Sequence, residues 1–130
     1  MTPAALLICA VVAVGDGDTL TCAGMEPRIR LDGIDAFERD QPQGALARRV
    51  LVEMVAGREI VCIPTATSWN RIVARCEIEG RDVSCALAAA GAGLIDERYD
   101  DRCADAETTA AFWGVGAHGG RYVTPWDWRH

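Results

Sequence analysis

The sequence predicts one α+β domain, mainly β, in which five short strands form a barrel accompanied by about three α-helices. The chain has 130 residues, of which 50% are hydrophobic and 25% charged, which is enough for a single globular core. Repeats, low-complexity runs and linkers are absent from the sequence, so residues 1–130 are expected to form one domain. Short apolar runs bounded by Gly, Pro and Asp are interrupted by segments with helical periodicity.

The expected strands lie on both sides of the first helix. Residues 10–14 and 19–23 are apolar runs that flank a Gly-Asp-Gly-Asp turn, which predicts a hairpin. Pro64 follows the expected strand at residues 59–63, and Gly80 follows the one at residues 72–78. The remaining expected strands are residues 28–31, 59–63 and 72–78.

Three segments have the signals of helices. Gly44–Val55 carries apolar side chains at helical spacing, and Gly57 is expected just beyond its C-terminus. Asp82 is expected to cap a second helix at residues 83–90, and Ala104–Trp113 is the third. Five short strands interrupted by a helix in this order are typical of a partly open barrel of the OB type.

Six cysteines in a short chain indicate disulfides and an oxidising compartment. None forms a Cys-x-x-Cys pair, which argues against a zinc ribbon or a thioredoxin-like site. Joining consecutive cysteines would close local loops between neighbouring elements. The expected pairs are Cys9–Cys22, Cys62–Cys76 and Cys85–Cys103. The alternative is a cytosolic protein with buried free thiols.

The apolar segment at residues 3–14 lacks a positively charged flank and is too short to span a bilayer. We therefore expect no membrane segment, and interpret this run largely as the first strand. A secreted or periplasmic monomer is expected, with any signal segment lying upstream of the sequence given.

The net charge limits how this protein could bind nucleic acid. Lys and Arg total 13 against 19 Asp and Glu, which gives a net charge of −6. Non-specific affinity for polyanions comes largely from basic side chains, so this balance argues against binding by overall charge. Any nucleic-acid activity must depend on one cleft with a metal ion and a few arginines.

The richest candidate site combines Asp18 with Arg30, Asp35 and Glu38, which lie at the ends and turns of the short apolar segments. Carboxylate oxygens are the ligands of hard divalent cations, and a guanidinium fork fits a phosphate. Taken singly, each residue has a simpler explanation. The Asp-Gly turn is ordinary hairpin chemistry, and Arg30 and Glu38 could be solvated surface.

Three motifs in the same order resemble the staphylococcal nuclease (thermonuclease-like) family over nearly the full chain. They are Gly-Asp-Gly-Asp-Thr at 15–19, Arg-Leu-x-Gly-Ile-Asp-x-x-Glu at 30–38 and Asn-Arg-Ile-Val-Ala-Arg at 70–75. The resemblance implies a calcium-dependent endonuclease on an OB-type barrel. Such an enzyme cuts DNA and RNA to products with 3′-phosphate ends.

The resemblance also implies a ligand set for Ca²⁺. Asp18 and Asp35 match the metal-binding carboxylates of the family. Ala36 stands where the family supplies a backbone carbonyl, which needs no particular side chain. Asp16 matches a nearby acid that is not itself a ligand.

The catalytic groups follow from the same match. Glu38 matches the proposed general base that activates the attacking water. Arg30 and Arg71 match the two arginines that hold the phosphate and stabilise the charge developing on it.

The segment before Arg71 departs from the family pattern, which commonly reads Asp-x-Tyr-Gly-Arg. Here it reads Thr-Ser-Trp-Asn-Arg, so Trp69 would offer an aromatic face for stacking worth ~1–3 kcal/mol per base. Tyr99 lies near the tyrosines that line the nucleotide pocket in the family. The alternative is that Tyr99 is a half-buried loop tyrosine that does not line a nucleotide pocket.

The sequence therefore predicts a calcium-dependent nuclease acting on DNA and RNA. One alternative is a catalytically silent nuclease-like OB domain that binds nucleic acid or a protein partner. Another is an acidic metal-binding structural module whose arginines pair only with its carboxylates.

Overall fold

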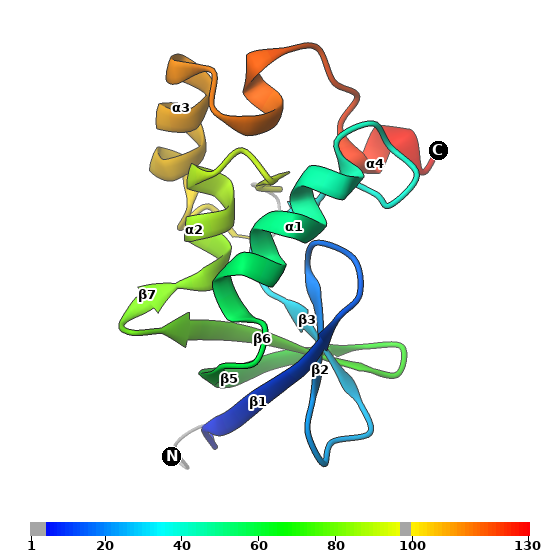
Figure 1. Ribbon diagram of the computed structural model, residues 1–130, viewed down its shortest axis with the longest axis vertical. Helices are drawn as coiled ribbons and strands as arrows, with labels where there is room; N and C mark the ends of the chain where they lie inside the picture. The colour runs from blue at the N-terminus through cyan, green and yellow to red at the C-terminus, as the bar shows by residue number, and fades with distance from the viewer. Residues whose placement is uncertain (1–4, 97–99) are drawn as a thin grey trace.

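The computed structural model describes residues 5–96 and 100–130, and its core is a closed mixed β-barrel (Figure 1). The main sheet has the strand order β3-β2-β1-β5-β6-β7, and pairing of β3 with β6 closes it. The barrel strands are β1 (Leu7–Val14), β2 (Thr19–Cys22), β3 (Arg28–Leu31), β5 (Glu59–Ser68) and β6 (Arg71–Ile78). The predicted α+β, mainly β, five-stranded barrel of the OB type is thus confirmed.

The closing pair brings two candidate arginines onto neighbouring strands. β3 and β6 run parallel with Arg28 opposite Arg71, which places Arg30 opposite Val73. The other barrel strands are antiparallel neighbours. Arg30 and Arg71 are far apart in the sequence, but the barrel closure sets them two positions apart along one strand pair.

The helices gather on one side of the barrel (Figure 1). The three predicted helices are confirmed as α1 (Gly44–Val55), α2 (Val83–Ala89) and α3 (Ala104–Trp113). A 3₁₀ helix, Gly116–Gly119, and a short helix α4, Pro125–Trp128, follow them. Within the described part of the chain, no helix has the length and apolarity needed to cross a membrane.

Local chemistry explains the first two helix boundaries. The buried face of α1 consists of Gly44, Ala47, Leu51 and Val55, at the three- and four-residue spacing of one helix face. Gly57 follows the end of α1 with φ of +72°, a conformation that favours glycine. The predicted cap of α2 is also present: the Asp82 carboxylate accepts a hydrogen bond of 3.2 Å from the Cys85 amide.

Strand β5 is longer than the sequence predicts, because it runs through Pro64. β1 pairs with β5 only as far as Cys62, so beyond that residue β5 pairs on one side, with β6. A missing amide hydrogen is tolerated on such an edge, and the ladder shifts register between Pro64 and Ala66. Three two-residue strands were also not predicted: β4 (Asp35–Ala36), β7 (Arg81–Asp82) and β8 (Gly93–Leu94).

All six cysteines form disulfides, in the predicted pairing. Two bridges join antiparallel neighbours within the barrel, and the third joins α2 to the start of α3. The Cα–Cα distances are 5.1 Å for Cys9–Cys22, 4.1 Å for Cys62–Cys76 and 4.8 Å for Cys85–Cys103. The free-thiol alternative is wrong, and the bridges indicate an oxidising, extracytoplasmic environment.

Candidate functional site

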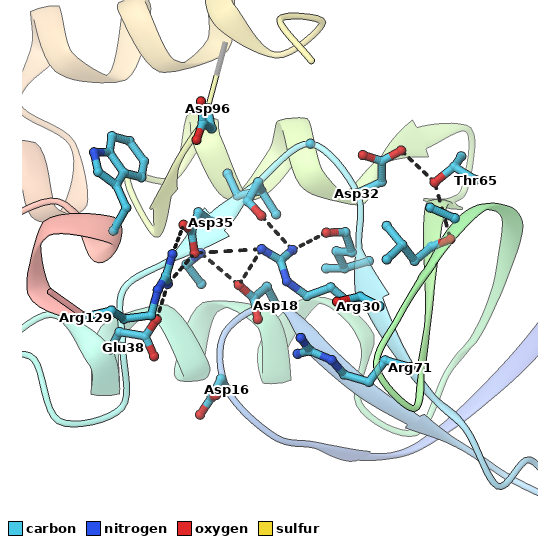
Figure 2. Close-up of a pocket in the computed structure, with 18 of the residues that line it drawn as sticks. Asp16, Asp18, Arg30, Asp32, Asp35, Glu38, Thr65, Arg71, Asp96 and Arg129 are labelled. Carbon is cyan, nitrogen blue, oxygen red and sulfur yellow. Dashed lines mark hydrogen bonds and ion pairs between the residues drawn. The ribbon is translucent and has the colours of Figure 1, made fainter. Parts of the chain in front are cut away.

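A cleft of about 830 Å³ lies beside the β3–β6 pair and brings together most of the residues singled out from the sequence (Figure 2). The turn before β2, the segment from β3 to the loop after β4, and the β5–β6 hairpin line it, together with α4 and the two residues after it. The predicted site residues in its lining are Asp16, Asp18, Arg30, Asp35, Ala36, Glu38 and Arg71.

Asp18 is the most buried acid of the cleft, with only 7% of its surface exposed. Its carboxylate accepts hydrogen bonds from the Ala36 amide at 3.0 Å and the Thr19 hydroxyl at 3.2 Å. Burial raises the pKa of Asp18, against the lowering effects of Arg30 and the Ala36 hydrogen bond. The positive charge near this carboxylate therefore does not fully compensate for its removal from water.

The preceding turn packs closely on its neighbours. A Cβ atom at Gly17 would lie 2.8 Å from the Ala47 side chain and 2.9 Å from that of Ala36. Only glycine allows the turn to approach α1 and β4 this closely. The Gly between the two acids therefore has a packing role, and it sets Asp18 against Ala36.

Asp35 extends the acidic group from the next element. It lies on β4, which β8 holds through the pairing of Asp35 with Leu94. The Arg30 guanidinium lies between the two acids, 3.4 Å from Asp18 and 3.8 Å from Asp35. Arg30 also donates to the carbonyls of Leu31 and Ile34, the latter at 2.7 Å, so its position is fixed by the backbone.

Glu38 lies in the loop between β4 and α1, which is tied down from within and from outside. Its amide donates to the Gln41 side chain at 2.7 Å, and Gln41 in turn donates to the Val123 carbonyl at 2.8 Å. Gln41 is only 4% exposed, so these bonds are shielded from water. The loop that carries Glu38 is therefore held against the segment preceding α4.

Arg71 is half-buried and enters the cleft from β6 (Figure 2). None of the ion pairs between described residues includes this guanidinium. An unpaired, partly buried guanidinium is suited to binding an anion that enters the cleft.

Arg129 is a cleft residue that the sequence analysis missed. Its guanidinium donates to both carboxylate oxygens of Asp35, at 3.1 and 2.8 Å, and also to Glu38 (Figure 2). Hydrogen bonding to Asp35 is the largest influence on the pKa of Arg129 and raises it. No local motif signals this contact, because it spans 94 positions in the sequence.

The cleft chemistry fits a hard divalent cation. Asp18 and Asp35 offer carboxylate oxygens, and Ala36, whose amide donates to Asp18, also lines the cleft. The raised pKa of the buried Asp18 shows that the positive charge around it does not offset its desolvation. A cation held by these three residues would supply that charge.

The predicted aromatic contact at Trp69 does not line the cleft. Trp69 is at the tip of the β5–β6 hairpin, where its side chain is 96% exposed and its φ is +58°. It lies between the cleft residues Ser68 and Arg71 in the sequence but does not line the cavity itself. Tyr99 lies outside the described residues.

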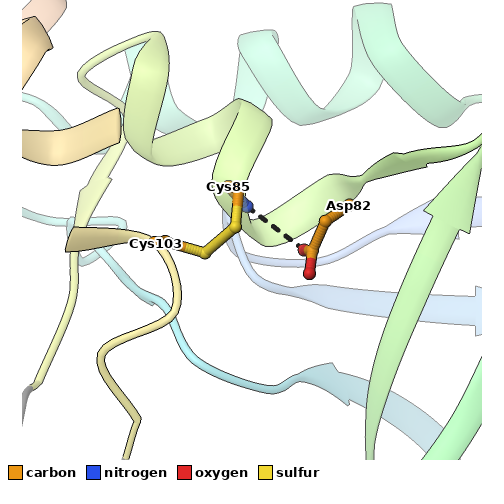
Figure 3. Close-up of side chains that lie close together, drawn as sticks. All are labelled: Asp82, Cys85 and Cys103. Carbon is orange, nitrogen blue, oxygen red and sulfur yellow. Dashed lines mark hydrogen bonds between the residues drawn. A yellow bond between two sulfur atoms is a disulfide. The ribbon is translucent and has the colours of Figure 1, made fainter. Parts of the chain in front are cut away.

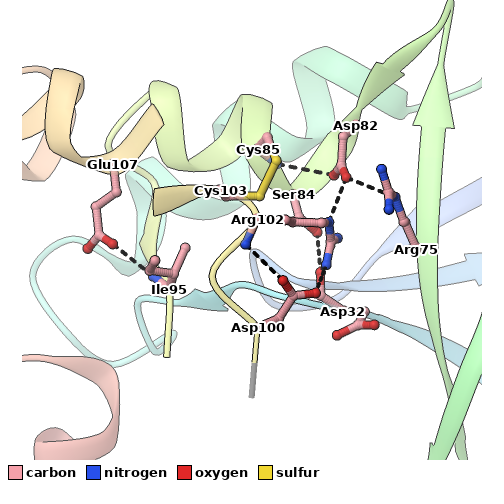
Figure 4. Close-up of a disulfide and its surroundings, with 10 residues drawn as sticks. All are labelled: Asp32, Arg75, Asp82, Ser84, Cys85, Ile95, Asp100, Arg102, Cys103 and Glu107. Atoms are coloured by element: carbon pink, nitrogen blue, oxygen red, sulfur yellow. Dashed lines mark hydrogen bonds and ion pairs between the residues drawn. A yellow bond between two sulfur atoms is a disulfide. The ribbon is translucent and has the colours of Figure 1, made fainter. Parts of the chain in front are cut away.

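A second cluster with metal-binding residue types has a structural role. Asp82, Cys85 and Cys103 lie close together, but the two sulfurs form a disulfide and cannot act as thiolate ligands (Figure 3). The Asp82 carboxylate caps α2 and pairs with Arg102 at 2.8 Å (Figure 4). Arg102 also donates to the Asp32 carbonyl at 2.8 Å, which ties the start of α3 to the β3–β4 connection.

We expect Asp18→Asn to raise the melting temperature of the cation-free protein at neutral pH. The folded-state pKa of Asp18 lies above its ordinary value of 3.8, so ionising this carboxyl costs stability as the pH rises above 3.8. The uncharged amide avoids that cost and keeps an oxygen for the Ala36 amide. Thermal melts in chelator from pH 4 to pH 8 measure this. A lower melting temperature for the variant at neutral pH would contradict it.

No protein-family model matches this chain, and no curated protein matches it either. Its fold and its site therefore define it: a disulfide-bonded OB-type barrel with carboxylates and arginines facing one cleft.

Proposed function

We propose that this protein is a calcium-dependent phosphodiesterase of the thermonuclease type, secreted or periplasmic and monomeric, that hydrolyses DNA and RNA to 3′-phosphate products. The observation that carries the proposal is the cleft itself. It gathers Asp18, Asp35 and Glu38 with Arg30, Arg71 and Arg129, and no acidic side chain among the described residues pairs with Arg71. The resemblance of the three motifs to the staphylococcal nuclease family supports the same activity.

Each cleft residue has a distinct task in this reaction. The Glu38 carboxylate accepts a proton from a water molecule, whose oxygen bonds to phosphorus as the P–O5′ bond breaks. Arg30 and Arg71 donate hydrogen bonds to the phosphate oxygens, on which negative charge builds up. The 5′ oxygen takes up a proton from solvent water and leaves as a hydroxyl, and Glu38 later returns its proton to solvent. A calcium ion held by Asp18, Asp35 and the Ala36 carbonyl would polarise the phosphate and neutralise part of its charge.

The structure of Arg30 supports its assigned role. Its guanidinium is anchored by two backbone carbonyls, which leaves little conformational freedom to lose when substrate binds. Its other contacts, to Asp18 and Asp35, are long ion pairs of 3.4 and 3.8 Å. An arginine placed in this way is pre-organised for a phosphate.

A second candidate function is a structural cation-binding module without turnover. The ion pairs favour it, because Arg30 and Arg129 already face the acids of the cleft. In that case calcium would raise the melting temperature, and nucleic acid would remain intact. The same measurements therefore separate the two candidates.

The test is degradation of a plasmid and of single-stranded DNA and RNA, with calcium and with chelator. We expect cleavage with calcium, none with chelator, and products whose 3′ ends carry phosphate. End-labelling before and after phosphatase treatment identifies those ends. Intact substrate at calcium concentrations up to millimolar and pH values up to about 9, together with a calcium-dependent rise in melting temperature, would favour the structural module.

A further inference from the structure

Arg129 occupies the acidic end of the cleft in a way that the proposed reaction does not use. Its two terminal nitrogens face both oxygens of Asp35, at 3.1 and 2.8 Å, and one of them also reaches Glu38 (Figure 2). The Asp35 side chain is only 13% exposed, against 42% for that of Arg129. The guanidinium therefore covers a proposed cation ligand and the proposed base together.

The segment around α4 holds this guanidinium in place. Pro125 begins α4 and is buried, and the Thr124 hydroxyl accepts a hydrogen bond of 3.2 Å from the Asp127 amide. Trp128 donates to Asp40 at 2.9 Å, on the same loop that carries Glu38. Arg129 comes directly after these anchors, so its approach to Asp35 follows from how α4 is docked.

We propose that Arg129 is a built-in competitor of the divalent cation, covering Asp35 and Glu38 until a cation displaces its guanidinium. This inference rests on the cation site of the proposed function. A bidentate arginine uses the same carboxylate oxygens that a hard cation requires. Binding a cation to Asp35 must therefore break both hydrogen bonds between Arg129 and that carboxylate.

The displacement needs only a small movement. The anchors of α4 lie before Arg129, and its side chain is partly exposed to the open cleft. Rotation of that side chain would free Asp35 and Glu38 while α4 stays docked. The released guanidinium would remain at the cleft, which limits the electrostatic cost of separating it from the acids.

The test is a calorimetric titration of the full chain with calcium alone, without nucleic acid. Arg129→Gln should bind calcium about threefold to fivefold more tightly than the wild type, as expected for losing a partly exposed ion pair. Arg121→Gln is the matched control, because it removes the same charge from the segment that leads into α4. The control should change the affinity less than twofold. Arg129→Lys should give an intermediate affinity, because it keeps the charge but loses the fork.

Equal affinities for Arg129→Gln and Arg121→Gln, or weaker binding by Arg129→Gln, would overturn the competition. Asp35→Asn, titrated in parallel, shows which proposal has failed. If Asp35→Asn abolishes calcium binding while the two arginine variants agree, only the competition is wrong. If Asp35→Asn binds calcium like the wild type, the cation site of the proposed function is wrong as well.

Discussion

Glu38→Gln should slow cleavage of single-stranded DNA by about 10²–10⁴-fold at saturating calcium, the range expected for losing a general base. The amide keeps the size of the carboxylate but cannot accept the proton of the attacking water. The backbone of the loop is fixed independently of this side chain, because the Glu38 amide bonds to Gln41. The expected loss is therefore in the chemical step, with the fold intact.

Asp40→Asn is the matched control for this variant. It removes the same charge from the same loop, and the amide oxygen can still accept the hydrogen bond from Trp128. Its cleavage rate should stay within about twofold of the wild type, because exposed charge changes of this kind have small effects. Saturating calcium is needed, since losing the contact between Glu38 and Arg129 also changes access to Asp35. Wild-type turnover by Glu38→Gln would remove Glu38 from the mechanism.

The fold was largely predictable because its signals are local. Gly57 and Asp82 mark helix boundaries through their own backbone and side-chain chemistry, and both act as expected. The exception at Pro64 is instructive. A proline normally ends a strand, but here β1 no longer covers β5, and that depends on strand pairing that the local sequence does not encode.

Most residues of the candidate site could also be found from local motifs. Asp18, Asp35 and Glu38 lie in short motifs at strand ends, and the resemblance to a known family put Arg71 beside them. Arg129 could not be found in this way, because its contact with Asp35 depends on how α4 docks. Tertiary docking thus adds a bidentate partner of Asp35 that no spacing pattern indicates.

Complete reduction of the disulfides is expected to unfold the protein at 37 °C. The three bridges span 13, 14 and 18 positions in the sequence. A loop of about 15 residues corresponds to roughly 3 kcal/mol of stabilisation for each bridge. Three such contributions are comparable to the whole unfolding free energy of a small domain, about 5–15 kcal/mol. The barrel strands would therefore lose their stability together, since two bridges join barrel neighbours.

Circular dichroism and mass spectrometry after reduction and alkylation would measure this. The mass should show six alkylated cysteines per chain. On heating, the reduced protein should show no cooperative unfolding transition above 37 °C. The double variant Cys85→Ala/Cys103→Ala separates the barrel from the helices, because it keeps the Cys9–Cys22 and Cys62–Cys76 bridges. It should remain folded with an unfolding free energy lower by about 3 kcal/mol. A fully reduced protein that still melts cooperatively above 37 °C would mean that the barrel core alone sustains the fold.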